Sequence, residues 1–104
     1  MDDELSIRTS LEGTTATVAA EGEIDLSTVD ELRAAVTAAA EDGIDELRLD
    51  LTKVEFIDSA GLGGLLELRS TLRHRSVTLR ISAGEGPVRQ AMEITGLSEL
   101  LAKN

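Results

Sequence analysis

The 104-residue chain contains no cysteine. It therefore has no disulfide framework, no thiolate nucleophile and no cysteine metal site, and the absence suits a reducing compartment. Its apolar stretches are all short, and none approaches the roughly 20 residues that span a bilayer. The first residues, MDDEL, are acidic where a secretory signal is basic. We therefore expect a soluble, cytoplasmic protein with no part in a membrane.

Basic side chains are scarce as well, with 10 Lys and Arg against 20 Asp and Glu, and a formal net charge of -10. This balance argues against direct nucleic-acid binding, which needs cations to neutralise phosphates. The acidity is uneven, because residues 1–58 carry a net charge of -12 and residues 59–104 a net charge of +2. The acidic part either steers a basic partner or is a solvated face, and both interpretations remain open.

The length predicts one domain over residues 1–104, large enough to bury a core without a metal or a disulfide. Apolar residues alternate with polar ones from Leu5 to Leu11 and again from Ala16 to Ala20, which predicts a β-hairpin. The stretch EGEID at residues 21–25 breaks that alternation. A further strand is predicted from about Glu46 to Leu51, parallel to the second strand through a right-handed crossover.

The remaining pattern predicts three helices and a fourth strand. Ser27 and Asp30 form a capping signature for an amphipathic helix that Gly43 ends. A second helix is predicted from about Ser59 to Arg73. After it come a strand with Val77, Leu79 and Ile81, a helix that opens at Pro87 and ends at Gly96, and a last turn with Leu97, Leu100 and Leu101 packed on the core.

The run LRLDLTKVEFIDSAGLGGLL, residues 47–66, leads from a strand through a short bridge into the second helix. Asp58 can cap that helix and Ser59 lies in its first turn, at the end of the sheet where ligands of α/β proteins collect. The opening turns contain Gly61, Gly63 and Gly64, and each glycine costs a helix about 0.5–1 kcal/mol relative to Ala. Either packing on the sheet or close approach of a partner explains them, and both explanations remain open.

The sequence gives little support for an enzyme, a metal site or a cofactor. The only histidine, His74, lies between two arginines and is interpreted as a surface residue near a helix end. Without Cys or a second His, a zinc site would need carboxylates alone. The glycine-rich fragments lack the spacing of nucleotide loops. Asp25, Asp50 and Asp58 are explained by capping and turn roles. We expect no catalysis, no metal and no cofactor.

Two roles are open for Ser59 on physical grounds. Its hydroxyl could satisfy a free backbone amide beside the Asp58 cap. Alternatively it could be a phosphorylation switch, because a helix start tolerates a phosphate of charge about -1.5 to -2. The dianion beside Asp58 and Glu55 would repel a partner without unfolding the protein.

The stretch DLTKVEFIDSAGLGGLL, residues 50–66, resembles the signature of STAS domains, in particular of bacterial anti-sigma factor antagonists. GEID at residues 22–25 and TGL at residues 95–97 are similar to further family features. The resemblance implies an α/β fold with a mixed sheet of four to five strands, formed by an N-terminal hairpin and then parallel strands connected by crossover helices, with three to four helices in all.

The resemblance also implies a mechanism and a site. The unphosphorylated antagonist binds an anti-sigma factor that is a serine kinase and so releases the sigma factor. Phosphorylation of Ser59 ends the complex, and a PP2C-type phosphatase restores it. The implied partner-binding residues are Asp25, Asp58, Ser59, Ala60, Gly61 and Leu62.

Two features depart from the family pattern, and one alternative function remains. Members often continue after TGL with another strand and helix, whereas this chain ends at Asn104, and residue 60 is Ala where Ser or Thr is frequent. STAS-like domains also occur as subunits or regulatory modules of lipid and anion transport complexes, and this is the alternative function.

Overall fold

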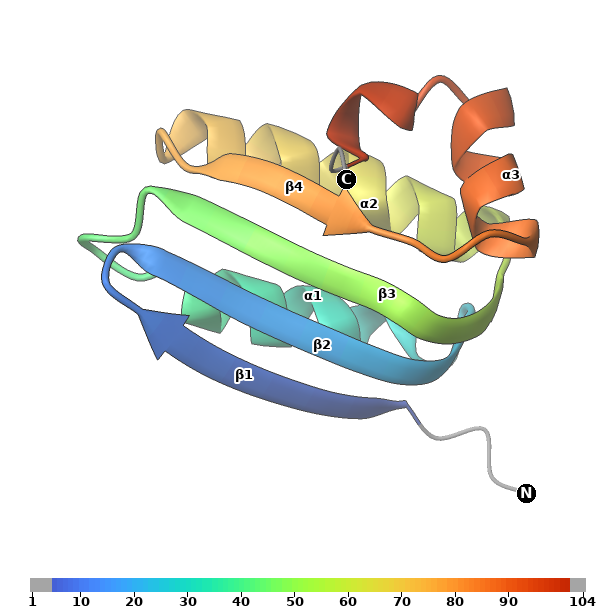
Figure 1. Cartoon of the computed structure of the whole chain (residues 1–104), viewed down its shortest axis with the longest axis horizontal. Helices are drawn as coiled ribbons and strands as arrows, with labels where there is room; N and C mark the ends of the chain where they lie inside the picture. The colour runs from blue at the N-terminus through green and yellow to red at the C-terminus, as the bar shows by residue number, and fades with distance from the viewer. Residues whose placement is uncertain (1–4, 102–104) are drawn as a thin grey trace.

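The computed structural model describes residues 5–101, which form a four-stranded mixed sheet with two helices packed behind it (Figure 1). The strand order is β1-β2-β3-β4; β1 pairs antiparallel with β2, and β2, β3 and β4 run parallel. The strands are β1 (Ser6–Glu12), β2 (Thr15–Ile24), β3 (Glu46–Ile57) and β4 (Thr78–Ser82). The hairpin and the parallel pairing of the second and third strands are confirmed.

The helices are α1 (Val29–Ala39), α2 (Ser59–His74) and α3 (Pro87–Ile94), followed by a 3-10 turn, η1 (Ser98–Leu100). In Figure 1, α1 and α2 lie behind the sheet, and α3 and η1 lie beyond β4 at the upper edge. A single bridge from Ile81 to Leu101 extends the β4 edge. These elements fit the predicted class of four to five strands and three to four helices.

The core lies between the sheet and the helices. Rows of apolar side chains cross the strands, for example Val18, Leu49 and Ile81, which are paired in register and fully buried. Side chains on the opposite face of the sheet are polar or small, because successive residues of a strand point to opposite faces. One such row contains Arg8, Ala19, Asp50 and Ser82.

The predicted bridge after Leu51 is wrong, because β3 continues without interruption to Ile57. Relative to β2, β3 contains two extra residues, at the register shifts between Ala19 and Glu21 and between Gly22 and Glu23. Each extra residue changes which face the next side chain takes, so the buried positions are spaced by two up to Leu51 and by three afterwards. The pattern therefore loses its strand period while the chain stays extended.

Two predictions for the β2–α1 connection are also wrong. Residues 21–24 belong to β2 and do not end it. Ser27 does not cap α1, since Thr28 occupies the N-cap position and its buried hydroxyl accepts from the Asp25 amide at 3.0 Å and donates to the Glu23 carbonyl at 2.9 Å. Ser27 instead donates its hydroxyl to Asp25 Oδ1 at 2.7 Å. The hydroxyls of this loop therefore stabilise the turn before the helix.

The glycines at the start of α2 have different surroundings. A Cβ at Gly61 would lie 2.6 Å from Ile57 Cγ1 and 2.8 Å from Ile24 Cγ2, and a Cβ at Gly64 would collide with Val29 Cγ2. A Cβ at Gly63 would meet nothing within 4 Å. Packing therefore requires two of the three glycines, which settles the question for Gly61 and Gly64 and leaves Gly63 unexplained by packing.

This contrast makes a testable pair of variants. We expect Gly64→Ala to lower the free energy of unfolding by about 1–3 kcal/mol, because the added methyl overpacks the α1–α2 contact. Gly63→Ala adds the same methyl group one residue away, in open space. It is expected to raise the free energy of unfolding by roughly 0.5–1 kcal/mol. Urea unfolding followed by circular dichroism measures both, and equal effects of the two substitutions would contradict the packing assignment.

Candidate functional site at the β3–α2 junction

The junction between β3 and α2 is held by Asp58. This residue is the N-cap of α2, and its Oδ1 accepts a hydrogen bond from the Gly61 amide at 2.9 Å. Its own amide donates to the Ile24 carbonyl at 3.2 Å, which ties the helix start to the end of β2. The predicted capping role of Asp58 is confirmed.

Ser59 is the first residue of α2 and is exposed. The amide that a capping side chain would satisfy, that of Gly61, is already bound by Asp58. Among residues 5–101 no hydrogen bond to the Ser59 hydroxyl is formed. The local capping role considered for this hydroxyl is therefore not observed, and its oxygen is available at the surface.

Asp25 lies at the neighbouring strand end. Ile24 and Ile57 are paired in register across β2 and β3, so the residues after them, Asp25 and Asp58, leave the sheet side by side. Hydrogen bonds from Ser27, first of all from its hydroxyl, hold the pKa of the Asp25 carboxyl below its usual value. The junction thus brings two acidic side chains together at one end of the sheet.

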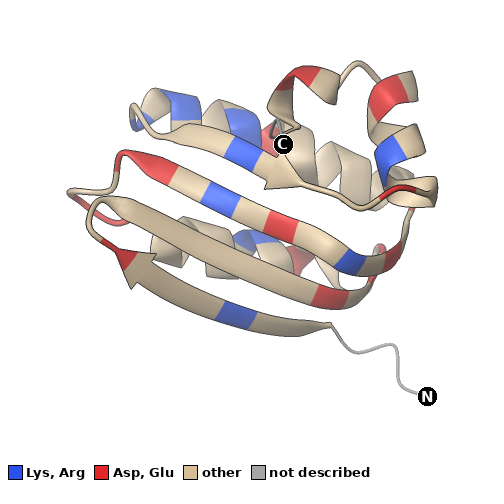
Figure 2. Ribbon diagram, in the orientation of Figure 1, with Lys and Arg blue, Asp and Glu red and all other residues tan. Residues whose placement is uncertain are grey.

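The charge around this end is mostly negative. Figure 2 shows acidic residues towards the ends of β2 and β3 and in the loop before α3. Lys53 of β3 lies between Asp50 and Glu55 in the sequence. The first turn of α2 contains no acidic residue, while Arg73 and His74 lie in its last turn. The positive end of the α2 dipole lies at Ser59, where it favours an anion and opposes the surrounding acidic charge, including that of Asp58, which accepts from the Gly61 amide.

Exposed apolar side chains lie on the elements of the junction, and three of them, Leu26, Phe56 and Leu66, were not predicted as site residues. Leu26, in the loop after β2, is 77% exposed, and Phe56, next to the end of β3, is 46% exposed. On α2, Leu62 is half-buried and Leu66 is 41% exposed. Leu26 stands beside Asp25 in the sequence and Phe56 is the only aromatic residue, signals that could have identified them.

The predicted contact residues thus lie at one end of the sheet. Asp25 and Asp58 flank each other on adjacent strand ends, and residues 58–62 are consecutive at the cap and first turn of α2. Gly61 is buried, Ala60 and Leu62 are half-buried, and Ser59 is exposed. Gly61 can act only through the backbone, because it packs against Ile24 and Ile57.

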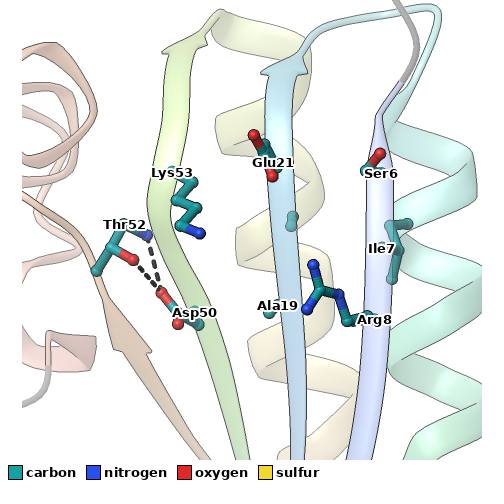
Figure 3. A pocket seen from close by; sticks show the side chains of 9 residues that line it. Ser6, Ile7, Arg8, Ala19, Glu21, Asp50, Thr52 and Lys53 are labelled. Atoms are coloured by element: carbon teal, nitrogen blue, oxygen red, sulfur yellow. Dashed lines mark hydrogen bonds between the residues drawn. The ribbon is translucent and has the colours of Figure 1, made fainter.

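A separate pocket of about 390 Å³ lies on the open face of the sheet (Figure 3). Its lining contains charges of both signs. Arg8 and Lys53 are basic, and Glu21 and Asp50 are acidic. The Asp50 side chain is hydrogen-bonded to Thr52, whose amide and hydroxyl donate to Asp50 Oδ1 at 2.9 and 2.6 Å. The pocket does not include Ser59.

His74 and the acidic side chains are the remaining candidates for chemistry in the described part of the chain. His74 is exposed near the end of α2, with Nδ1 2.8 Å from the Ser70 carbonyl oxygen, which confirms its predicted position. Within residues 5–101, no group of three or more His, Cys, Asp or Glu is placed to hold a metal ion. No helix in this range is long and apolar enough to cross a bilayer.

Residues 7–102 match the family model described as "Mlab, STAS domain". The chain belongs to the STAS domain family. Among curated proteins, this STAS domain is 31% identical over 100 residues to the anti-sigma-B factor antagonist of Staphylococcus aureus. The alignment covers 96% of this chain and 93% of that protein.

Solved structures agree with the family assignment. The STAS domain superimposes on an anti-sigma factor antagonist from Mycobacterium paratuberculosis with a TM-score of 0.87 and 26% identity, covering 100% of this chain and 90% of that one. It shares its fold with unphosphorylated SpoIIAA at a TM-score of 0.80 and 19% identity, over 95% and 88% of the two chains. It also shares the fold of the phosphorylated Bacillus SpoIIAA, at a TM-score of 0.73 and 18% identity, over 95% and 91%.

The capping bond at the junction can be tested directly. We expect Asp58→Ala to lower the free energy of unfolding by about 1 kcal/mol, because the Gly61 amide loses its acceptor. Asp58→Asn keeps an oxygen acceptor and is expected to remain within a few tenths of a kcal/mol of the unsubstituted protein. Urea denaturation at pH 7 measures both variants, and an Asn variant as unstable as the Ala variant would show that charge, rather than the hydrogen bond, holds the junction.

Proposed function

We propose that this STAS domain is an anti-sigma factor antagonist whose binding is switched off by phosphorylation of Ser59. The observation that carries the proposal is an exposed serine hydroxyl at the first position of α2, next to a cap already satisfied by Asp58. The likeness to the Staphylococcus aureus antagonist over 96% of the chain supports the same function.

The proposed partner is an anti-sigma factor that is also a serine kinase. Its contact surface here is the β3–α2 junction, with Asp25, Asp58, Ser59, Ala60, Gly61 and Leu62. Exposed Leu26, Phe56 and Leu66 supply apolar area around the serine, which a docked partner would bury. Gly63 has open space where its side chain would be, which permits a partner to approach the backbone of α2.

Phosphate at Ser59 would change the surface more than the fold. The phosphoryl group would lie at the positive end of the α2 dipole, in a first turn without acidic residues, so the helix accommodates it. Its charge of about -1.5 to -2 would add to the carboxylates of Asp25 and Asp58. A partner that docks closely on these carboxylates would meet a like charge, which costs several kcal/mol at an interface.

The protein acts in this proposal as a ligand and a substrate, and not as a catalyst. The kinase supplies ATP and transfers its γ-phosphoryl group to the Ser59 oxygen, ADP leaves, and the hydroxyl proton is released. A PP2C-type phosphatase hydrolyses the ester and restores the hydroxyl. We place the exchange in the cytoplasm, where sigma factors act.

Ser59 is expected to be the acceptor. The unphosphorylated chain is used as bait in a native lysate, and the captured kinase is then incubated with it and with ATP. Intact-mass and peptide mass spectrometry are expected to find one phosphate, on Ser59. The Ser59→Ala variant should remain unmodified, whereas Ser70→Ala, which removes another exposed serine of the same helix, should be modified normally.

Binding of the captured kinase is expected to fall by at least tenfold for phosphorylated protein and for Ser59→Asp, with unchanged circular dichroism. Ser70→Asp adds the same charge about three turns away on α2 and is the matched control. Tight binding by the Ser59 variants would contradict the repulsion. Recovery of a transporter ATPase and no kinase would favour the alternative, a subunit of a transport complex.

A further inference from the structure

The outer edge of β1 is a second surface that the proposed function does not use. β1 is the first strand of the sheet, and within residues 5–101 only β2 pairs with it. Its register with β2 is unbroken from Ser6 to Glu12, and it contains no proline. Natural edge strands are usually protected by proline, bulges or charged side chains, because an unpaired edge invites another strand. β1 has neither a proline nor a bulge, and its two charged residues, Arg8 and Glu12, are of opposite sign.

The geometry of the hairpin fixes which residues face that edge. Glu12 and Thr15 are paired across a two-residue loop that starts with Gly13, whose φ is +63°, as in a type II′ turn. The pair that closes such a loop is hydrogen-bonded, and bonded residues then alternate along the strand. Even-numbered residues of β1 therefore bond to β2, and Ile7, Thr9 and Leu11 direct their amides and carbonyls outward.

The charges on β1 are complementary to a second copy of the same strand. An antiparallel pair related by a two-fold axis at Ser10 places Arg8 opposite Glu12 of the second copy, and Glu12 opposite its Arg8. In this register the outward-facing Thr9 and Leu11 form the hydrogen-bonded pairs. The charged residues take the intervening pairs, in which Cα atoms are only about 4.5 Å apart. The same antiparallel register therefore satisfies both the outward-facing backbone groups of β1 and its two charged residues.

We propose that two copies of this chain associate through their β1 edges, forming a continuous sheet of twice the width. The pairing would bring Leu11, which is 66% exposed, beside Thr9 of the second copy and diagonal to its Leu11. Arg8 leans over β2 in Figure 3 and is exposed, and the proposed pairing requires its side chain to turn outward. The contact is one strand wide, so the dimer is weak and depends on concentration.

Room for the second copy exists behind the sheet. Arg33 and Thr37 of α1 line the groove shared with α2, together with Leu68 and Thr71. The opposite flank of α1, about half a turn away, carries Ala35 and Ala39, which are half-buried on the side of β1. Ala35 and Ala39 are small, and the larger side chain of the same row, Glu31, is exposed at the start of the helix, so the second half of this flank offers space for a second copy. The surface is distinct from the β3–α2 junction, so each copy keeps its Ser59 exposed.

Sedimentation equilibrium at 0.15 M NaCl, over micromolar to millimolar concentrations, tests the proposal without any partner. We expect reversible dimerisation of the unsubstituted chain. Arg8→Glu and Glu12→Arg should each raise the dissociation constant by roughly 3- to 30-fold, since two ion pairs become like-charge pairs. The double variant reverses both charges and should return to within about threefold of the unsubstituted value. Arg80→Glu, on β4, is the matched control and should leave it unchanged.

If net charge alone controlled association, the two single variants would change the dissociation constant in opposite directions. Arg8→Glu makes the chain more negative, whereas Glu12→Arg makes it less negative. Repulsion between copies of charge -10 would then change in opposite directions for the two variants. Thr9→Pro removes an outward amide without breaking the pairing to β2, and should abolish the dimer while circular dichroism stays unchanged. A monomer at every concentration, a dimer that persists in Thr9→Pro, or a double variant as weak as the single ones would overturn the proposal.

Discussion

The contact of Gly61 with Ile24 and Ile57 is the constraint on which the rest of the site depends. It seats the first turn of α2 on the ends of two neighbouring strands, with no room for even one methyl group. Asp58 further fixes this turn by accepting a hydrogen bond from the Gly61 amide. Because the buried side of the turn is filled in this way, Ser59, two residues earlier, is left at the surface with its hydroxyl unused by the fold.

In the proposed function, this arrangement separates stability from partner binding. The apolar contacts and the cap that hold the β3–α2 junction do not involve the serine oxygen, so a group attached to that oxygen leaves them in place. The positive end of the α2 dipole stabilises added negative charge locally. In the proposed function, the same charge is unfavourable for a partner that docks against Asp25 and Asp58, so we expect phosphorylation to lower the affinity and not the stability.

Much of the fold could be predicted from the sequence, because short-range residue patterns specify most of its helices and strands. Alternation identifies the hairpin and the first half of β3, and DSAG at residues 58–61 marks the cap and the serine. Prediction failed after Leu51, where two extra residues in β3 change the spacing of buried side chains while the strand continues. Such bulges are defined by the partner strand and leave no periodic signal.

The remaining errors also concern contacts that depend on tertiary structure. Ser27 and Asp30 have the spacing of a capping box, but the turn after β2 places Thr28 at the N-cap position and directs Ser27 to Asp25. The exposure of Leu26 and Phe56 depends on how the strand ends and loops are arranged in space, which composition and spacing do not encode. The unused hydroxyl of Ser59 likewise becomes visible only in three dimensions.

Amide NMR spectra of the chain before and after stoichiometric phosphorylation of Ser59 test the central claim most directly. The account predicts shift changes confined to the strand ends, the β2–α1 loop and the first two turns of α2, with core resonances such as those of Val18 and Leu49 unmoved. Shift changes that spread through the sheet, or loss of dispersed resonances, would show that phosphate acts by altering the fold, and would contradict the account.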